Sequence, residues 1–459
     1  MGALESKANI ERMVSLVNSG NAVPDVSWRR HKLKQLLAGL RKNEDFAVKI
    51  MQDELGRGRY ETLLFELVPL SRCLKYLIKN LPSLARERKV KGSWMTFPAR
   101  ASVVQEPYGV VLVYPSWNYP FLLALEPVAG AVAAGNRVIV KFPERMNRSF
   151  ALVKRILGEV FDESEVVCVG NELEHEELYR QRIDYIFYTG NPWQASEIIR
   201  LSAERIIPFT LELGGKNPCI VDSSANLRVA ARRIVWGKFT NAGQTCIAPD
   251  YLLVNKSIKS EFLNEVAAEI KRVYGEFPLD DPGCGRIVDT RAYERLSSMC
   301  VNGRLITGGE KKPEEKRISP TLLDQLHPDD PLLTQEVFGP LLGVVVYDSA
   351  DELFSILRRN PSPLAVYFFG NDRSLEERLK KSFASGSLVI NDCLTQFVNM
   401  NLPFGGVGRS GVGSYHGKRT FECFSHARSV MKQSGWFDTN LRYRGGWLKE
   451  KVVEFLFRH

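Results

Sequence analysis

The pattern of hydrophobic and polar residues changes its period several times along the chain, and each change predicts a different kind of element. Residues 1–80 have the spacing of amphipathic helices, including one long pattern from Arg29 to Met51. From Val90 to Pro107 the chain is rich in aromatic and β-branched residues around Pro98, which predicts an extended, hairpin-like segment. The residues after Trp447 predict one further amphipathic helix, too short and too charged to span a bilayer.

Two regular series of strands and helices fill the space between these segments. The first series predicts strands at 109–114, 137–140, 165–169, 184–187 and 209–211, with helices at 120–134, 148–161 and 192–203. The second predicts strands at 251–254, 343–347 and 364–369, with helices at 226–238, 258–274 and 353–360. Short apolar strands that alternate with helices indicate parallel sheets covered on both faces. The pattern therefore predicts an α/β protein with two parallel-sheet domains, and such sheets bind nucleotides at the carboxyl ends of their strands.

Length and charge narrow the class of protein only slightly. A chain of 459 residues is long enough for two or three domains. Its net charge of +9 is spread along the sequence without a compact basic and aromatic patch, which argues against nucleic-acid binding. Residues 1–13 lack an apolar core, so we expect no secretory signal, and no apolar run approaches the ~20 residues of a membrane span.

The cysteines and histidines indicate a reducing compartment and no metal site. The eight cysteines are widely spread and contain no C-x-x-C pair, which predicts free thiols and a cytoplasmic location. The six histidines show no ligand spacing, so no structural or catalytic metal is expected.

One polar loop carries the strongest candidate for chemistry. Cys246 lies between a predicted helix and a predicted strand, in the segment 239–251. A cysteine considered alone is more often a small buried hydrophobe than a nucleophile. The neighbours Thr240, Asn241, Gln244 and Thr245 instead offer hydrogen bonds where a core loop would offer methyl groups. Cys246 is therefore a candidate nucleophile.

Other polar residues follow predicted strands. Glu212 ends a strand and precedes Gly214, which suits a carboxylate aimed into a crevice, and Glu336 is a second carboxylate in an apolar setting. Gly190 forms a turn before Pro192, where free backbone N–H groups would face an anion. Lys141 and Glu144 follow another strand and could bind a ribose; the alternative is a solvated loop pair.

The glycine pattern at 406–411 is a weak signal by comparison. It matches G-x-G-x-x-G, but no predicted strand precedes it, so we interpret it as a false match for dinucleotide binding.

The segment Phe239-Thr-Asn-Ala-Gly-Gln-Thr-Cys-Ile-Ala-Pro-Asp-Tyr251 closely resembles the nucleophile loop of the NAD(P)-dependent aldehyde dehydrogenases. Its Ala-Pro-Asp-Tyr ending is similar to the class 3 branch, which includes fatty and aromatic aldehyde dehydrogenases. At least five motifs between residues 100 and 430 follow the order of that family. The resemblance implies the family's α/β fold, with two Rossmann-like parallel-sheet domains and a β-hairpin oligomerisation arm.

The resemblance also implies boundaries for these parts. The NAD(P)-binding domain would comprise 1–82 and 103–212, and the catalytic domain 213–417. The arm would comprise 83–102 and 418–435 and pair across the subunits of a homodimer, leaving 436–459 as a C-terminal tail.

The same resemblance implies a role for each motif residue. Cys246 would attack the aldehyde, Asn118 and the Cys246 backbone N–H would form the oxyanion hole, and Glu212 would activate water to hydrolyse the thioester. The residues implied in cofactor binding are Lys141, Glu144, Thr189, Gly190, Leu213, Gly214, Glu336 and Phe338. Glu144 near the ribose favours NAD over NADP because it would repel a 2′-phosphate, although class 3 enzymes often accept both.

The implied substrate is a medium- or long-chain aliphatic aldehyde or an aromatic one, with Tyr119, Trp236 and Phe397 as walls of an apolar tunnel. Two alternatives stay open. A CoA-acylating aldehyde dehydrogenase would also form a thioester, but thiolysis needs no base for water. A non-catalytic dinucleotide-binding protein would bind the cofactor without turnover.

Overall fold

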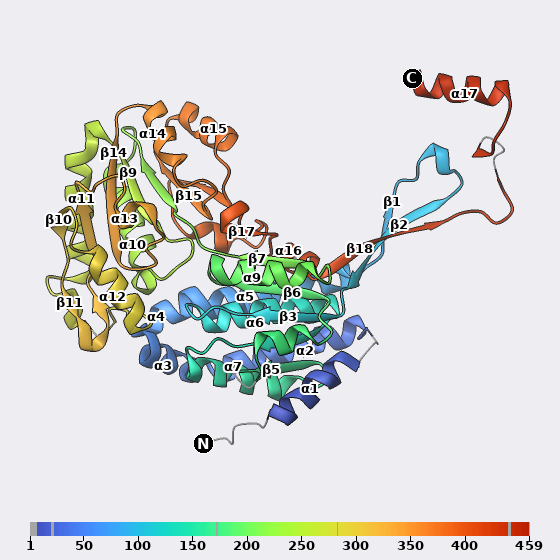
Figure 1. The fold of residues 1–459 in the computed structure, drawn as a ribbon, viewed down its shortest axis with the longest axis horizontal. Helices are drawn as coiled ribbons and strands as arrows, with labels where there is room; N and C mark the ends of the chain where they lie inside the picture. Colours follow the sequence, from blue (N-terminus) through green and yellow to red (C-terminus); the bar gives the residue numbers. More distant parts are fainter. Residues whose placement is uncertain (1–6, 20–22, 171–172, 282, 439–441, 459) are drawn as a thin grey trace.

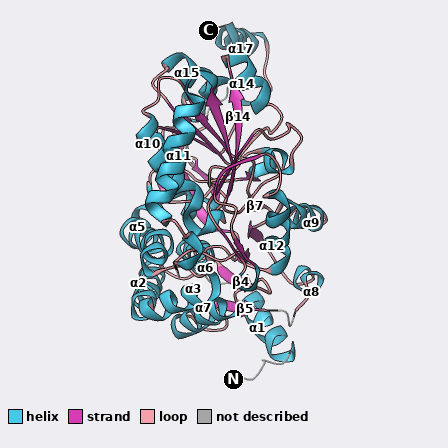
Figure 2. Ribbon diagram, turned by 90° about the vertical axis from the view of Figure 1, so that its left-hand side faces the viewer, coloured by secondary structure: helices cyan, strands magenta, loops and turns pink. Residues whose placement is uncertain are grey.

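Two large, mostly parallel sheets form the body of the protein and confirm the predicted α/β fold class (Figure 1). The structure is a computed structural model that describes residues 7–19, 23–170, 173–281, 283–438 and 442–458. Helices flank the strands on both sides, as the view in Figure 2 shows.

The first sheet has six strands in the order β17-β7-β6-β3-β4-β5. These strands are β3 (Val110–Tyr114), β4 (Arg137–Lys141), β5 (Val166–Val169), β6 (Tyr185–Thr189), β7 (Phe209–Glu212) and β17 (Gly411–Val412). All neighbours are parallel except β17, which runs antiparallel to β7. The carboxyl ends of the parallel strands, where nucleotides bind in such sheets, therefore lie along one edge.

Both faces of the first sheet are buried, because successive residues of a strand point to opposite sides. In β3, Val111 and Val113 pack in one apolar cluster, whereas Val110 and Leu112 pack in another. The first cluster includes side chains of α2 (Val26–Lys42), α3 (Glu44–Leu55), α5 (Val68–Leu84), α6 (Pro120–Ala134) and α7 (Asn147–Val160). The second includes side chains of α1 (Lys7–Ser19), α8 (His175–Tyr179) and α9 (Pro192–Ala203).

The second sheet has seven strands in the order β10-β13-β14-β9-β8-β15-β16. They are β8 (Pro218–Val221), β9 (Tyr251–Asn255), β10 (Arg304–Thr307), β13 (Thr321–Asp324), β14 (Leu341–Tyr347), β15 (Ala365–Phe369) and β16 (Ser387–Ile390). Its helices are α10 (Leu227–Phe239), α11 (Lys259–Tyr274), α12 (Thr290–Met299), α13 (Pro331–Thr334), α14 (Ala350–Leu357) and α15 (Arg373–Ser382). Only the β10–β13 pair is antiparallel among these seven strands.

A third sheet of three antiparallel strands extends away from the body (Figure 1). The strands β1 (Arg88–Val90) and β2 (Arg100–Pro107) form the predicted hairpin, and β18 (Ser425–Lys432) pairs along β2 as a third strand. Helix α17 (Trp447–Arg458) follows this sheet with its side chains exposed. The role of the sheet as an oligomerisation arm stays a prediction.

The structure differs from two details of the sequence patterns. The helical pattern from Arg29 to Met51 is divided into α2 and α3 at Asn43, whose side-chain amide donates to the carbonyl of Gly39 at 2.8 Å. This bond helps to close α2 at its C-terminus, and α3 begins directly after it, a break that amphipathic spacing does not record. The strand β17 belongs to the range expected for the catalytic domain, yet it extends the first sheet, so the domain boundaries stay a prediction.

All eight cysteines are free thiols, as their spacing predicted. Within the described ranges, no helix is both long and apolar enough to cross a bilayer.

Replacing one leucine in each of two strands would test where the second sheet draws its stability. We expect Leu252→Ala to lower the free energy of unfolding by ~2–5 kcal/mol, because the side chain is fully buried and its loss leaves a cavity. The matched control is Leu305→Ala on β10, where the leucine is 51% exposed and the expected change is below ~0.5 kcal/mol. Urea unfolding of both variants measures the difference, and equal losses would contradict this packing.

Candidate active site

Cys246 lies on the loop between α10 and β9, and the backbone of this loop is unusual. A short turn, η3 (Thr240–Gly243), contains two consecutive non-glycine residues in the left-handed region, Asn241 at φ 54° and Ala242 at φ 53°. Left-handed backbone costs an L-residue ~1–2 kcal/mol, less for asparagine than for alanine. Contacts with the rest of the chain must therefore hold the loop.

Asn217, at the start of β8, provides one such set of contacts. Its side-chain amide donates to the carbonyl of Cys246 at 2.7 Å and to that of Ala248 at 3.0 Å. Its side-chain oxygen accepts from the backbone N–H of Ala365 on β15 at 2.9 Å. A single buried asparagine thus fastens the cysteine turn to two neighbouring strands of the second sheet.

Asn118 contacts the same loop from the first sheet. It follows β3, is buried, and donates one amide proton to the carbonyl of Gln244 at 3.1 Å, two residues before Cys246. An asparagine amide carries two protons, so the second is available to an oxyanion. This placement fits the predicted oxyanion hole.

The environment of the Cys246 thiol opposes its ionisation. Burial raises the pKa of Cys246 to about 12, and the nearby carboxylates of Glu336 and Glu212 add to the shift. The backbone N–H groups of Cys246 and Ile247 act in the opposite direction. The thiol is therefore protonated at neutral pH, and attack by the thiolate requires a base that removes its proton.

Glu212 ends β7 and faces this thiol as a buried carboxyl group. Neither of its carboxylate oxygens has a hydrogen-bond partner among the described residues. Burial, and then the charge of Glu126, raise the pKa of Glu212 well above the ordinary range of a carboxyl group. A carboxylate with a raised pKa is a stronger base than a solvated one, which suits proton transfer from a thiol or from water.

The glycine segment at 406–411 supports Glu212 instead of forming a separate phosphate loop. Gly411, in β17, pairs with Glu212 across the edge of the first sheet. The backbone N–H of Leu213 donates to the carbonyl of Ser410 at 3.1 Å.

Glu336 and Phe338 lie opposite the loop that follows Glu212, at residues 213–215. The Glu336 carboxylate accepts from the backbone N–H of Gly215 at 3.0 Å, and a β-carbon at Gly214 would overlap that carboxylate. Burial and the charge of Asp250 raise the pKa of Glu336 to about 7. The ring of Phe338 meets the ring of Trp117 edge to face at 5.6 Å.

Asp250 and Arg295, to which the sequence assigned no role, hold the backbone between Glu336 and Phe338 in place. Asp250 accepts from the backbone N–H of Val337 at 3.1 Å and pairs with Lys216 at 2.6 Å. Arg295 donates to the carbonyl of Val337 at 2.6 Å. Asp250 lies in the motif around Cys246, directly before an apolar strand, so the sequence did offer a reason to consider its carboxylate. Nothing near Arg295 in the sequence indicated that its side chain would contact Val337.

The other residues predicted to bind the dinucleotide end or follow strands of the first sheet. Lys141 ends β4 and its ammonium group donates to the carbonyl of Leu173 at 2.9 Å and also to that of Gly170. Glu144 is exposed in the next loop. The hydroxyl of Thr189, at the end of β6, is buried without a hydrogen-bond partner within the described part of the chain.

The expectation of free backbone N–H groups after Gly190 needs correction. The N–H of Asn191 donates to the Tyr188 hydroxyl at 2.9 Å, and the Asn191 side chain accepts from the N–H of Gln194 at 3.0 Å as the cap of α9. These donors are therefore already used within the chain. The sequence pattern gave no sign that the Tyr188 side chain would turn back over the loop.

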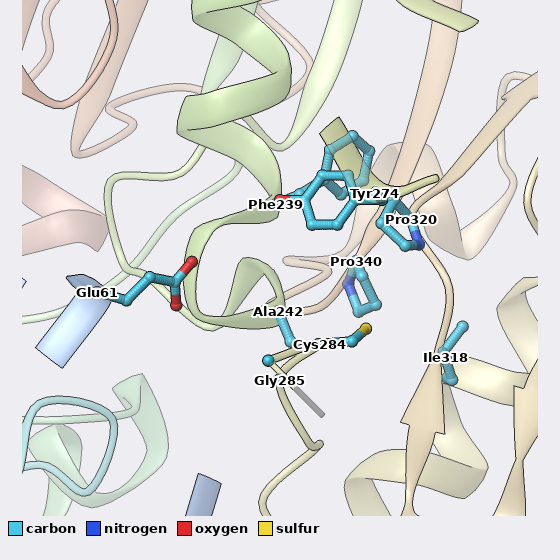
Figure 3. Close-up of a pocket in the computed structure, with 10 residues that line it drawn as sticks. Glu61, Phe239, Ala242, Tyr274, Cys284, Gly285, Ile318, Pro320 and Pro340 are labelled. Atoms are coloured by element: carbon cyan, nitrogen blue, oxygen red, sulfur yellow. The ribbon is translucent and has the colours of Figure 1, made fainter. Parts of the chain in front are cut away.

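A small cavity lies behind the nucleophile loop (Figure 3). Its lining includes Ala242, Glu61, Tyr274 and Cys284, but not Cys246. It is therefore separate from the face of the loop where the thiol lies.

Comparison with known proteins agrees with this arrangement of a half-buried cysteine on a loop held between two mostly parallel sheets. A model of the aldehyde dehydrogenase family matches residues 5–430, a longer stretch than the motifs covered. The chain therefore belongs to the aldehyde dehydrogenase family, whose activity is the oxidation of aldehydes, as the resemblance predicted.

Named relatives point to one branch of the family. The chain is 38% identical to aldehyde dehydrogenase family 3 member H1 of Arabidopsis thaliana, over 91% of this chain and 87% of that protein. It is 35% identical to 4,4′-diaponeurosporen-aldehyde dehydrogenase of Staphylococcus aureus, over 95% of both chains. A solved structure described as the substrate-bound state of Staphylococcus aureus AldH superposes with a TM-score of 0.94 at 34% identity, over 98% of this chain and 99% of that one.

The raised pKa of Cys246 predicts how the cofactor-free protein reacts with iodoacetamide. Because only the thiolate reacts, we expect the alkylation rate of Cys246 to rise without a plateau through pH 9, where an ordinary thiol with a pKa of ~8.5 begins to level off. Peptide mass spectrometry measures modification at Cys246 alone. A plateau below pH 8 would contradict this environment.

Glu336→Gln should speed this alkylation several-fold, because it removes a neighbouring negative charge and so lowers the pKa of Cys246. The acceleration should appear above pH 7, where Glu336 is ionised, and fade below it. Glu197→Gln, at an exposed carboxylate on α9, serves as the control and should leave the rate unchanged. Equal rates for all three proteins would refute the electrostatic account.

Proposed function

We propose that this enzyme oxidises an apolar aldehyde to the carboxylic acid with NAD⁺ or NADP⁺ and hydrolyses a thioester formed on Cys246. The observation that carries the proposal is the Glu212 carboxyl group, which is buried, has a raised pKa and lacks any partner among the described residues. A group kept in this state is suited to accept a proton, which hydrolysis requires and thiolysis by CoA does not.

In the first step, Glu212 accepts the proton of Cys246 and the thiolate sulfur bonds to the aldehyde carbon, so that the carbonyl oxygen becomes an oxyanion. The second amide proton of Asn118 and the backbone N–H of Cys246 then donate to this oxygen. Because both donors are fixed before the reaction, they stabilise the developing charge without reorganisation. Removal of one such donor typically costs ~3 kcal/mol of transition-state stabilisation, about a hundredfold in rate.

The residues of the cofactor site fit a dinucleotide. Gly214 leaves room for the Glu336 carboxylate, and the Thr189 hydroxyl, which has no hydrogen-bond partner among the described residues, is able to donate to an acceptor on the cofactor. Bound NAD(P)⁺ supplies the acceptor for the hydride that leaves the aldehyde carbon. Lys141 and Glu144 would hold the adenosine ribose, and the exposed carboxylate of Glu144 would disfavour a 2′-phosphate, so we propose a preference for NAD⁺.

After the hydride has left, Glu212 releases to solvent the proton that it took from Cys246 and is again a carboxylate. In the last step it removes a proton from water, and the resulting hydroxide attacks the thioester on Cys246. The carboxylic acid leaves and the thiol is restored by the proton that Glu212 holds. The same carboxyl group thus serves both halves of the reaction, which its burial beside Cys246 allows.

The substrate class follows from the residues around the thiol. The ring of Phe397 packs against Phe404 and His416, the ring of Tyr119 lies beneath the Arg57 guanidinium group, and the ring of Trp236 lies 5.7 Å from that of Phe65. The aromatic surfaces of these three side chains support a medium- or long-chain aliphatic aldehyde or an aromatic one. The homodimer and the cytoplasmic location stay predictions from the sequence.

The function is tested by following NAD⁺ reduction with decanal and with benzaldehyde in the absence of CoA. We expect multiple turnovers for the wild type and none for Cys246→Ala. Glu212→Gln should lower steady-state turnover by ~10²–10⁴-fold, because general-base catalysis contributes about that factor. Glu197→Gln is the matched carboxylate control and should retain wild-type turnover.

Two outcomes would replace the proposal. A single burst that becomes multiple turnover only when CoA is added would identify an acylating aldehyde dehydrogenase. Binding of NAD⁺ without any burst for either aldehyde would favour a protein that binds the dinucleotide without catalysis.

A further inference from the structure

Helices α2 to α5, near the N-terminus, contain a buried ion pair that reaches the candidate active site. Arg57 precedes α4 (Arg59–Thr62), and Glu66 lies in the following π-turn, η1 (Leu63–Leu67). Both side chains are completely buried, and a guanidinium nitrogen of Arg57 pairs with the Glu66 carboxylate. Moving two charges from water into the protein interior costs free energy even when the charges pair. The other hydrogen bonds of Arg57 and Glu66 show which part of the chain this pair holds in place.

The remaining hydrogen bonds of the pair end on the Asn118 segment. Arg57 donates through its other terminal nitrogen to the backbone carbonyl of Asn118 at 3.3 Å. The second carboxylate oxygen of Glu66 accepts from the backbone N–H of Phe121 at 2.9 Å, in the first turn of α6. The two side chains therefore hold the backbone around Asn118 at two points: Arg57 binds the Asn118 carbonyl, and Glu66 binds the first turn of α6.

Arg57 also fixes the next residue, Tyr119. Its guanidinium group lies over the Tyr119 ring, 4.9 Å from the centroid. The Tyr119 hydroxyl shares a hydrogen bond of 2.5 Å with the hydroxyl of Thr245, the residue before Cys246. The contact thus continues from Arg57 through Tyr119 to the nucleophile loop.

A third side chain of the same helices contacts the loop directly. The Glu61 carboxylate, in α4, accepts from the backbone N–H of the left-handed Asn241 at 3.4 Å. The Asn241 side chain in turn donates to the carbonyl of Asn118 at 3.1 Å, the same oxygen that Arg57 binds. Arg57 and Asn241 thus converge on one carbonyl between the oxyanion asparagine and the nucleophile loop.

We propose that Arg57, paired with Glu66, is a positioning residue that sets the Asn118 amide at the distance from Cys246 that oxyanion stabilisation requires. The inference rests on the proposed function. An oxyanion donor acts only when it is held within a few tenths of an ångström of the charge that develops, and loosening its backbone weakens that contact. Arg57 itself touches no reacting atom and acts through Asn118.

The test measures the burst of NADH formation in a stopped-flow experiment with decanal. The double variant Arg57→Met/Glu66→Gln removes both charges together, so that neither is left buried alone. We expect the burst rate constant to fall about 10- to 100-fold, less than or equal to the loss in Asn118→Ala, which removes the donor itself. The dissociation constant of NAD⁺ should stay within about twofold of wild type, because no cofactor contact changes.

The decisive comparison places the same double variant in an Asn118→Ala background. If Arg57 acts through Asn118, its replacement should change the burst rate constant by less than about twofold there, since coupled residues are not additive. An equal fold-loss in both backgrounds would show a general structural effect and overturn the proposal. An unchanged burst rate constant in the double variant would also overturn it.

Two further variants keep the result interpretable. Arg57→Lys retains the charge beside Glu66 but loses the planar guanidinium group that also reaches Asn118, so we expect an intermediate fall in the burst rate constant. A wild-type rate constant in this variant would contradict the proposal even if the double variant does not fold. Arg59→Met removes an arginine two positions away, whose exposed pairs with Glu44 and Asp45 measure 2.5 and 2.6 Å, and should match wild type. Absence of any NADH formation by the wild type would count against the proposed function, not against this inference.

Discussion

The left-handed turn at Asn241 and Ala242 determines where the Cys246 thiol can lie, and this turn is unfavourable unless other parts of the chain hold it. Its support comes from both sides. Asn217 fastens the turn to the second sheet, whereas Asn118 reaches it from the first sheet. A reaction centre built in this way is most rigid when both sheets are in place, which explains why so many buried polar side chains lie between them.

Three carboxylates lie around this centre, two of them buried, and the contacts of each indicate a different role. Asp250 is paired with Lys216 and with a backbone N–H, so it acts as a structural group. Glu336 accepts a hydrogen bond from one backbone N–H and has a pKa of about 7. Its carboxylate therefore has a structural contact and is also able to bind a ligand. Glu212 has no partner among the described residues and burial raises the pKa of its carboxyl group well above the ordinary range, so it is suited to move protons.

The sequence predicted features that depend on neighbouring residues better than features that depend on distant ones. Strands β3 to β7 of the first sheet, strands β9, β14 and β15 of the second and the loop of Cys246 follow from local patterns and motifs, because period and turn chemistry are local. The other strands of the second sheet, β8, β10, β13 and β16, were not predicted. The pairing of β17 with β7 and the contact of Arg57 with Asn118 join segments far apart in the chain, so no local pattern records them.

The central claim is that catalysis passes through a thioester on Cys246 that Glu212 helps to hydrolyse. The most direct measurement is peptide mass spectrometry of Glu212→Gln after reaction with decanal and NAD⁺ and rapid quenching in acid. The account predicts that a decanoyl adduct forms more slowly in this variant than in wild type, because Glu212 also takes the thiol proton, but then accumulates on the peptide that contains Cys246 because hydrolysis is impaired. Hydroxylamine should remove the adduct, and wild type should accumulate far less of it. An adduct on another cysteine, or NADH formation without any acylated peptide, would contradict it.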